Sequence, residues 1–238
     1  MSGAELKAGA RKLIMENSPK LFLVSIIFIV IVTVLSELQF RLIGTLTTYT
    51  ALRERLSSGE LPNLSMLYTE FRPPGAALAL VLYMLNPVIE IGFMSYCLKT
   101  TRAIAGDVKD VLNGFQYFIK VILLSIMIAI LVFLWSMLFL FPGIVASYRY
   151  RQAYYILLDA PEKGVMQCIR ESKQLMAGSK LDLFLVDLSF IGWFFLDVIV
   201  VLLIPAPFAI PVVSIWLTPY IGLTHAGFYE RLLNRAVI

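Results

Sequence analysis

Long stretches without charge constrain the fold of this chain more than any other feature. Residues 21–36 and 121–148 contain no Asp, Glu, Lys or Arg, and in 183–229 only Asp187 and Asp197 are charged in this sense. A helix needs about 20 predominantly apolar residues to cross the hydrocarbon core of a bilayer. The stretches therefore predict membrane-embedded helices, because a soluble protein would have too little amphipathic surface to cover them.

The composition supports this class. Hydrophobic residues make up 59% of the chain, charged residues 15%, and the mean hydropathy is +0.83. A soluble domain would carry roughly 25% charged residues. The sequence therefore predicts an all-α, polytopic transmembrane bundle that forms a single integral membrane domain over residues 1–238.

The apolar segments suggest six membrane-embedded helices. Three prolines, Pro205, Pro207 and Pro211, divide the last long run into two segments, because proline interrupts a helix. One segment is uncertain because it contains Arg149 and Arg151. The five clear spans are 21–38, 76–98, 118–141, 183–204 and 207–228, and the uncertain one is 143–158.

The distribution of Lys and Arg favours six spans over five. Positive charges collect in cytoplasmic loops. Six spans with both termini in the cytoplasm place 14 Lys and Arg residues inside and 4 outside. Five spans with an external N-terminus place 12 inside and 8 outside, so that topology remains the alternative.

A weak internal repeat is compatible with an even number of spans. Segments 11–28, 111–126 and 172–190 each contain a basic helix, a break, and an apolar run. The repeats would cover 4–98, 103–158 and 161–232. Parallel repeats of this kind occur in transporters, although any polytopic protein can produce a similar succession by chance.

Two amphipathic segments are predicted to lie in the cytoplasmic interface, where their basic residues would contact anionic lipid headgroups. A glycine, Gly178, is expected to end the second segment. The two apolar stripes are Leu6, Ala10, Leu13 and Ile14 in the first segment, and Val165, Met166, Ile169 and Met176 in the second.

Ionisable residues inside the predicted spans are the candidate site. Charges in lipid are costly and usually face a partner or a wet cavity. Depth along the helices suggests that Arg149 or Arg151 pairs with Asp197, either to pin two helices together or to take part in transport. The full set of candidates is Glu90, Arg149, Arg151, Asp187 and Asp197.

Enzyme chemistry is not expected. The single histidine, His225, cannot build a two-histidine metal site, and the sequence has no phosphate-binding loop, dinucleotide fingerprint or nucleophile elbow. We therefore expect no catalytic residues, no cofactor and no metal. Nucleic acid is not expected as a partner either, since the chain has no long basic run.

The segment 141–193 resembles a bacterial membrane family catalogued as domain of unknown function 975, and more distantly the membrane domain of some glycerophosphodiester phosphodiesterases. Pro142, Gly143, Tyr148, Gly178 and the run Asp187 to Trp193 carry the resemblance. It extends weakly to about residue 92 and through 218–232. The resemblance implies a multi-pass protein of the bacterial plasma membrane, without an assigned activity or catalytic residues.

Two functions remain in view. The first is transport or export of a small or amphiphilic solute through a cavity lined by the embedded charges. The second is a noncatalytic membrane scaffold or immunity-type protein that binds a partner in the bilayer, either another membrane protein or a second copy of the chain. A lipid-modifying enzyme is less favoured, because no nucleophile and base occur together.

Overall fold

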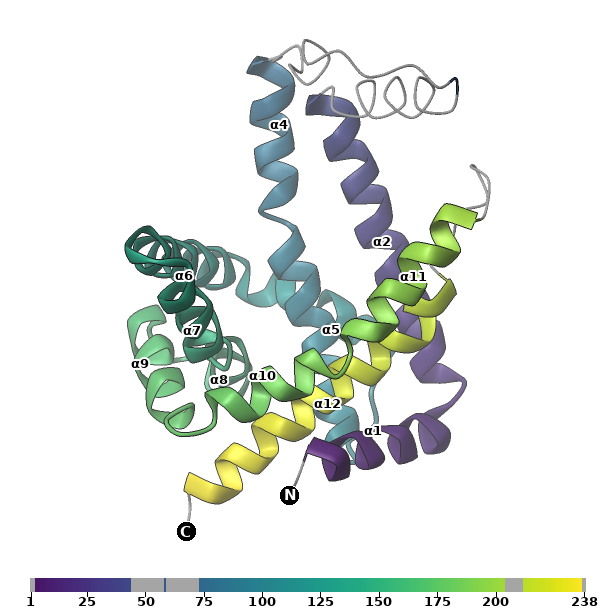
Figure 1. Cartoon of the computed structure of the whole chain (residues 1–238), viewed down its shortest axis with the longest axis vertical. Helices are drawn as coiled ribbons and strands as arrows, with labels where there is room; N and C mark the ends of the chain where they lie inside the picture. The colour runs from purple at the N-terminus through teal and green to yellow at the C-terminus, as the bar shows by residue number, and fades with distance from the viewer. Residues whose placement is uncertain (1–2, 44–57, 59–72, 204–211, 237–238) are drawn as a thin grey trace. The chain divides into compact units, whose positions relative to one another are not determined.

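The computed structural model describes residues 3–43, 58, 73–203 and 212–236, and every regular element in these ranges is helical (Figure 1). The predicted all-α class is confirmed for this part of the chain. The chain divides into two compact units, a large one of Met1–Phe28 with Pro87–Ile238 and a small one of Ile29–Asn86. The single-domain and three-repeat assignments stay predictions.

The small unit contains the second part of α2 (Lys20–Ile43) and α4 (Pro73–Tyr83). Its described apolar side chains are largely exposed, as in Val34 and Leu80. A salt bridge of 2.8 Å between Glu37 and Arg41 spans one turn near the end of α2. Exposed apolar helix surface is the expected character of a segment that faces lipid.

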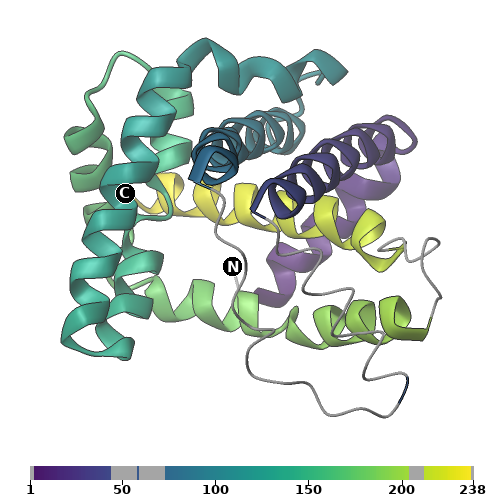
Figure 2. The same ribbon diagram turned by 90° about the horizontal axis from the view of Figure 1, so that it is seen from above.

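The large unit holds the remaining helices (Figures 1 and 2). Helices α6 and α7 pack against each other as a hairpin, α8 packs on α9, and α11 contacts α12. The elements are α1 (Gly3–Asn17), α5 (Asn86–Thr101), the 3₁₀ helix η2 (Val108–Tyr117), α6 (Phe118–Leu138), α7 (Leu140–Tyr150), α8 (Ala153–Asp159), α9 (Val165–Leu175), α10 (Lys180–Leu188), α11 (Ile191–Leu203) and α12 (Val212–Ala236).

Three helical segments within the described residues are long and apolar enough to cross a membrane, rather than the six expected. They are Lys20–Gln39, Ala77–Thr101 and Val108–Leu138. Most of their residues are not buried by the protein itself. These segments cover nearly all of the first three predicted spans, so this part of the prediction is confirmed at the level of helix length and composition.

Two of the later predicted spans are interrupted, and α12 (Val212–Ala236), which holds the described part of 207–228, is not among the helices apolar enough to cross a membrane. The segment 143–158 is divided by a turn at Arg151 and Gln152 into α7 and α8. An 11-residue helix such as α7 is roughly 16 Å long, about half the thickness of the hydrocarbon core. A second turn at Ser189 and Phe190 divides 183–204 into α10 and α11.

The apolar stripe of α1 is buried against protein, which corrects the interfacial assignment. Leu6, Ala10 and Ile14 are each at most 5% exposed, and α1 packs on α12 and α10. Leu6 lies in a small core with Phe228 and Leu232 of α12. A complementary apolar face of α12 therefore covers α1 and takes the place that lipid was expected to have.

The second amphipathic segment forms α9, with a buried face that differs in part from the prediction. Cys168, Ile169 and Ser172 are buried, whereas Met166 is 49% exposed. Met176 follows the helix and is fully buried. Gly178 has a φ of +77°, the left-handed conformation that ends helices, as predicted.

Candidate functional site

Arg151, Asp187 and His225 meet in the large unit, each from a different part of the C-terminal half. The guanidinium Nη1 of Arg151 donates to Asp187 Oδ2 at 2.5 Å. His225 Nε2 lies 2.7 Å from Asp187 Oδ1, and the Tyr148 hydroxyl donates to Asp187 Oδ2 at 3.0 Å. The Asp187 carboxylate on α10 therefore bonds to side chains of the segment Tyr148 to Arg151 and of α12. We call the four residues Tyr148, Arg151, Asp187 and His225 the Asp187 cluster.

Interruptions in the helices place two members of this cluster. Arg151 lies in the turn between α7 and α8, and Asp187 lies in the last turn of α10. The backbone N–H of Phe190 bonds to the carbonyl of Asp187 at 2.9 Å and ends that helix. The third member, His225, projects from α12 after Pro219. Helix ends expose unpaired backbone groups, so they suit polar side chains in an apolar region.

The hydrogen bonds indicate the tautomer of His225. Arg151 Nη2 lies 3.4 Å from His225 Nδ1, and because a guanidinium can only donate, Nδ1 must accept. The proton of the neutral ring is then on Nε2, where it points to Asp187 Oδ1. With one cation, one anion, a neutral ring and a neutral hydroxyl, the Asp187 cluster has no net charge.

The cluster is only partly shielded. The side chains of Arg151, Asp187 and His225 are 39%, 21% and 12% exposed. Of these three side chains, Arg151 is the most accessible and His225 the least. An incoming anion would therefore reach Arg151 first.

The other predicted site residues are not joined to this cluster by a described contact. Arg149 lies with its guanidinium 5.9 Å from the Tyr150 ring, and its backbone carbonyl accepts a bond from Ser172. Glu90 belongs to α5 and lies close enough to Arg151 for their charges to interact. Asp197 belongs to α11, but its side chain lies outside the described part of the structure, so the pairing with Asp197 stays a prediction.

Sequence reasoning did not include Tyr148 and His225 among the site residues. A usable signal existed for His225, which is the only histidine in the chain and interrupts an otherwise uncharged run after Asp197. No periodicity indicates that it would meet Asp187, because the two are 38 positions apart and belong to different helices. Contacts of this kind depend on tertiary packing.

A second polar network lies at the end of α5. The Arg102 guanidinium bonds to both carboxylate oxygens of Asp159 at 2.7 and 2.8 Å and to Glu230 Oε1 at 2.6 Å. The Tyr229 hydroxyl donates to Asp159 Oδ2 at 2.9 Å. Arg102 thus connects the ends of α5 and α8 to α12.

Metal and thiol chemistry finds no support in the described residues. Among them, no group of three or more His, Cys, Asp and Glu side chains is placed to hold a metal ion. The two cysteines, Cys97 and Cys168, are reduced and buried. The Asp187 cluster offers a guanidinium that can bind an anion and a histidine hydrogen-bonded to a carboxylate.

The comparisons with known proteins coincide with this part of the chain. Residues 139–236 match the family described as "Protein of unknown function (DUF975)". The matched range contains all four members of the Asp187 cluster. Neither a curated protein nor a solved structure matches the chain, so the resemblance to the membrane domain of glycerophosphodiester phosphodiesterases has no support beyond the sequence. The C-terminal region of this protein is therefore similar to a family whose function is unknown.

Proposed function

We propose that this protein is a membrane transporter or exporter of a small or amphiphilic solute, and that the Asp187 cluster is its polar centre. One observation carries the proposal: Arg151, Asp187 and His225 converge from three segments, two of them at helix interruptions. Interrupted helices with ionisable residues are how membrane transporters build binding sites.

The geometry suggests how a solute anion would bind. An anionic group that approaches the exposed side of Arg151 could replace Asp187 at the guanidinium. Asp187 would then keep its bonds to His225 and Tyr148, so no buried carboxylate would lose all its partners. Bidentate recognition by arginine suits a carboxylate or phosphate. The proposal assigns no bond-breaking step to any residue.

Three long apolar helices support a location in a membrane, which we propose to be the bacterial plasma membrane. Exposed apolar side chains on α6, such as Ile119, Phe133 and Met137, would face lipid or a membrane-protein partner. Anionic headgroups would neutralise the net charge of +4.

A noncatalytic scaffold is the second candidate, and a specific observation favours it. Both oxygens of the Asp187 carboxylate already have hydrogen-bond partners on α12 and in the segment Tyr148 to Arg151, as expected of a polar pin between helices. A scaffold would tolerate replacement of the cluster as long as the helices stay packed, whereas a transporter would not.

Cells that lack the protein, complemented with variants, distinguish the two functions. The test compares metabolites and lipids in cells and medium for the parent, Arg151→Gln with Asp187→Asn, and Arg149→Gln. The double variant removes both charges of the pair together, so that neither is left orphaned. Arg149→Gln is the matched control, because Arg149 is two positions away and outside the cluster.

Transport predicts that the parent and Arg149→Gln restore the same distribution of a solute between cells and medium, while the double variant does not. Membrane levels and melting temperatures of the variants must be measured alongside. If the double variant restores the distribution fully, or if no compound depends on the protein, the transport proposal is wrong and the scaffold is favoured.

A further inference from the structure

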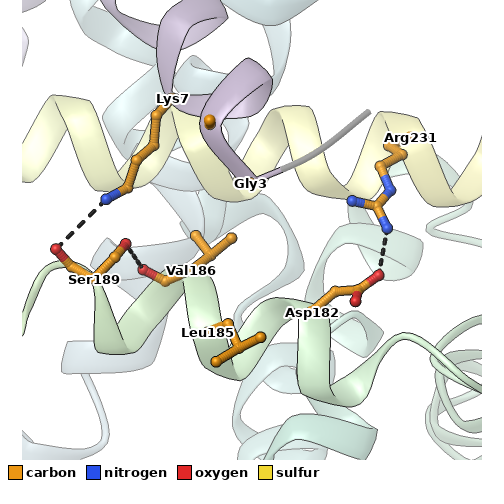
Figure 3. A pocket seen from close by; sticks show the side chains of 8 residues that line it. Gly3, Lys7, Asp182, Leu185, Val186, Ser189 and Arg231 are labelled. Carbon is orange, nitrogen blue, oxygen red and sulfur yellow. Dashed lines mark hydrogen bonds and ion pairs between the residues drawn. The ribbon is translucent and has the colours of Figure 1, made fainter.

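A half-open pocket of about 400 Å³ lies between α1, α10 and α12 and shares no lining residue with the Asp187 cluster (Figure 3). The start of α1 forms one wall, where a Cβ on Gly3 would be 3.2 Å from Val186. The opposite walls come from α10 and from Arg231 of α12. All the lining residues belong to the large unit. They are Gly3, Ala4, Lys7, Asp182, Leu185, Val186, Ser189 and Arg231.

Positive charge predominates in this pocket. Lys7 and Arg231 contribute two cations, and Asp182 contributes one carboxylate, which lies 2.5 Å from Arg231 Nη2. Lys7 has no carboxylate partner among the described contacts: its ammonium lies 3.5 Å from the Ser189 carbonyl and 4.2 Å from the Phe190 ring centroid. Burial and the nearby Arg11 lower the pKa of Lys7. An anion beside the ammonium would raise this pKa again, because it stabilises the charged form.

The other side of the pocket is apolar and continues onto the surface of α10. Leu185, which lines the pocket, is 53% exposed. Its neighbours along the helix, Leu181 and Leu188, are 65% and 45% exposed. A ligand with an anionic end and a hydrocarbon end would match both parts, since the charged end would meet Lys7 and the chain would cover the leucines.

We infer that this pocket binds the headgroup of an anionic phospholipid, with the phosphate near Lys7 and Arg231 and the acyl chains over the exposed leucines of α10. The inference rests on the membrane location contained in the proposed function. It does not require transport, because the pocket shares no residue with the Asp187 cluster. A lipid held here would link α1 to α10 and α12.

Binding is tested on the purified full chain in zwitterionic detergent. Phosphatidylglycerol, phosphatidylcholine with the same acyl chains, and inorganic phosphate are added separately, and bound ligand is measured by native mass spectrometry together with the melting temperature. Phosphatidylglycerol is expected to bind and to raise the melting temperature. Equal binding of the two lipids would overturn the inference, as would inorganic phosphate binding as tightly as phosphatidylglycerol, since the site would then hold free phosphate.

The variants localise the effect. Lys7→Gln should weaken phosphatidylglycerol binding about fivefold, the effect of one basic residue near an anionic lipid surface. Lys12→Gln is the matched control on the same helix, since Lys12 is exposed and lies outside the pocket. Equal affinity in these two variants would also overturn the inference.

The double variant of Arg151 and Asp187 separates this inference from the proposed function. It should bind phosphatidylglycerol like the parent even where it fails to restore the solute distribution. Lys7→Gln should restore that distribution. Loss of lipid binding in the Arg151 and Asp187 variant, with Lys7→Gln unaffected, would contradict the assignment of the headgroup to the pocket.

Discussion

Gly114 of η2 packs directly on Gly92 of α5, so that a Cβ built on Gly114 would lie 3.3 Å from the Gly92 backbone nitrogen and 1.8 Å from the Val88 carbonyl oxygen. A Cβ on Gly92 would in turn lie 1.8 Å from the Val111 carbonyl oxygen. Backbone atoms cannot move aside as a flexible side chain can. The two glycines therefore permit the backbones of η2 and α5 to lie in direct contact.

Gly92→Ala and Gly114→Ala should each destabilise the protein by about 1 to 3 kcal/mol or more, the usual cost of overpacking a close contact. Gly9→Ala is the control, because Gly9 lies inside α1 with nothing within 4 Å of an added Cβ. Alanine favours a helix interior more than glycine does, so the free energy of unfolding of this variant should exceed that of the parent by up to about 1 kcal/mol. Thermal melting in detergent compares the three, and equal melting temperatures would show that α5 and η2 can separate at little cost.

The first part of the fold could be predicted from sequence because apolar length is a local property. The uncharged residues after Lys20 and Lys120 form helices of the expected length. The later segments were predicted as continuous spans because hydropathy does not register a turn such as that at Ser189 and Phe190. Asp187, in the last turn of α10, bonds to side chains of other helices, and these bonds favour the turn that follows it. Such bonds depend on residues that are distant in the sequence.

Charges in apolar runs place Arg151 and Asp187 in one set of candidates, and the structure brings these two side chains together. Depth along the helices predicts Asp197 as the partner of Arg149 or Arg151, and this stays a prediction because the Asp197 side chain lies outside the described part of the structure. The described carboxylate partner of Arg151 is Asp187, at 2.5 Å. Depth along a helix follows from residue number only where the helix is uninterrupted, and the chain turns at Arg151 and Gln152.

Asp187→Asn or Arg151→Gln alone should lower stability by about 1 to 3 kcal/mol, because each leaves the other charge without its partner. The loss should be smaller than for a fully buried pair, since the Arg151 side chain is 39% exposed. The double variant should recover part of the loss. The melting temperatures of the two single variants and the double variant, each compared with the parent, measure this recovery. Additive losses would indicate that the two charges do not interact in the folded protein.

Arg102→Lys should destabilise the protein although it keeps the charge. The guanidinium binds Asp159 through two nitrogens and Glu230 through a third, which one ammonium cannot reproduce. With the Arg102 side chain 31% exposed, we expect a loss of about 1 to 2 kcal/mol. Lys109→Arg, at an exposed position outside this network, is the control for an exchange between lysine and arginine. A parent-like melting temperature for Arg102→Lys would mean that the bidentate geometry adds nothing.

The ion pair of Lys163 and Glu171 gives a pH dependence outside the membrane segments. Partial burial opposes the charged form of Glu171, but hydrogen bonds from Lys163 at 2.7 Å and Gln167 at 2.9 Å outweigh it and hold its pKa below the usual 4.5. A carboxylate whose pKa is lower in the folded protein stabilises it above the unfolded pKa. That contribution is lost as the pH falls through the lowered folded value.

The melting temperature of Glu171→Gln should therefore be lower than that of the parent at pH 7, and the difference should vanish in acid. The pair is about one third exposed, so the effect should be below about 1 kcal/mol, or roughly 2 to 4 °C. Glu16→Gln breaks a more exposed pair with Lys12, 3.7 Å apart, and should show no such dependence. A difference for Glu171→Gln that persists unchanged at pH 3 would rule out its charge as the cause.

The contact between α1 and α12 predicts on which side of the membrane the two ends of the described chain lie. Helix α1 precedes the first candidate span, and α12 follows the last. Three crossings alone would place α1 and the C-terminal half of α12 on opposite sides. Leu6 packs with Phe228 and Leu232 in one core, so these segments must share a side. We therefore expect the interrupted helices after Phe139 to return the chain across the bilayer, giving an even number of crossings.

Cysteine labelling tests this in a protein that lacks Cys97 and Cys168. Single cysteines at Met15, which is 74% exposed on α1, and at Asn234, which is exposed near the end of α12, should react from the same side. The excess of Lys and Arg favours the cytoplasm, so an impermeant thiol reagent should label neither in intact cells and both in inverted vesicles. Labelling of one position in intact cells and of the other only in inverted vesicles would contradict the packing of α1 on α12.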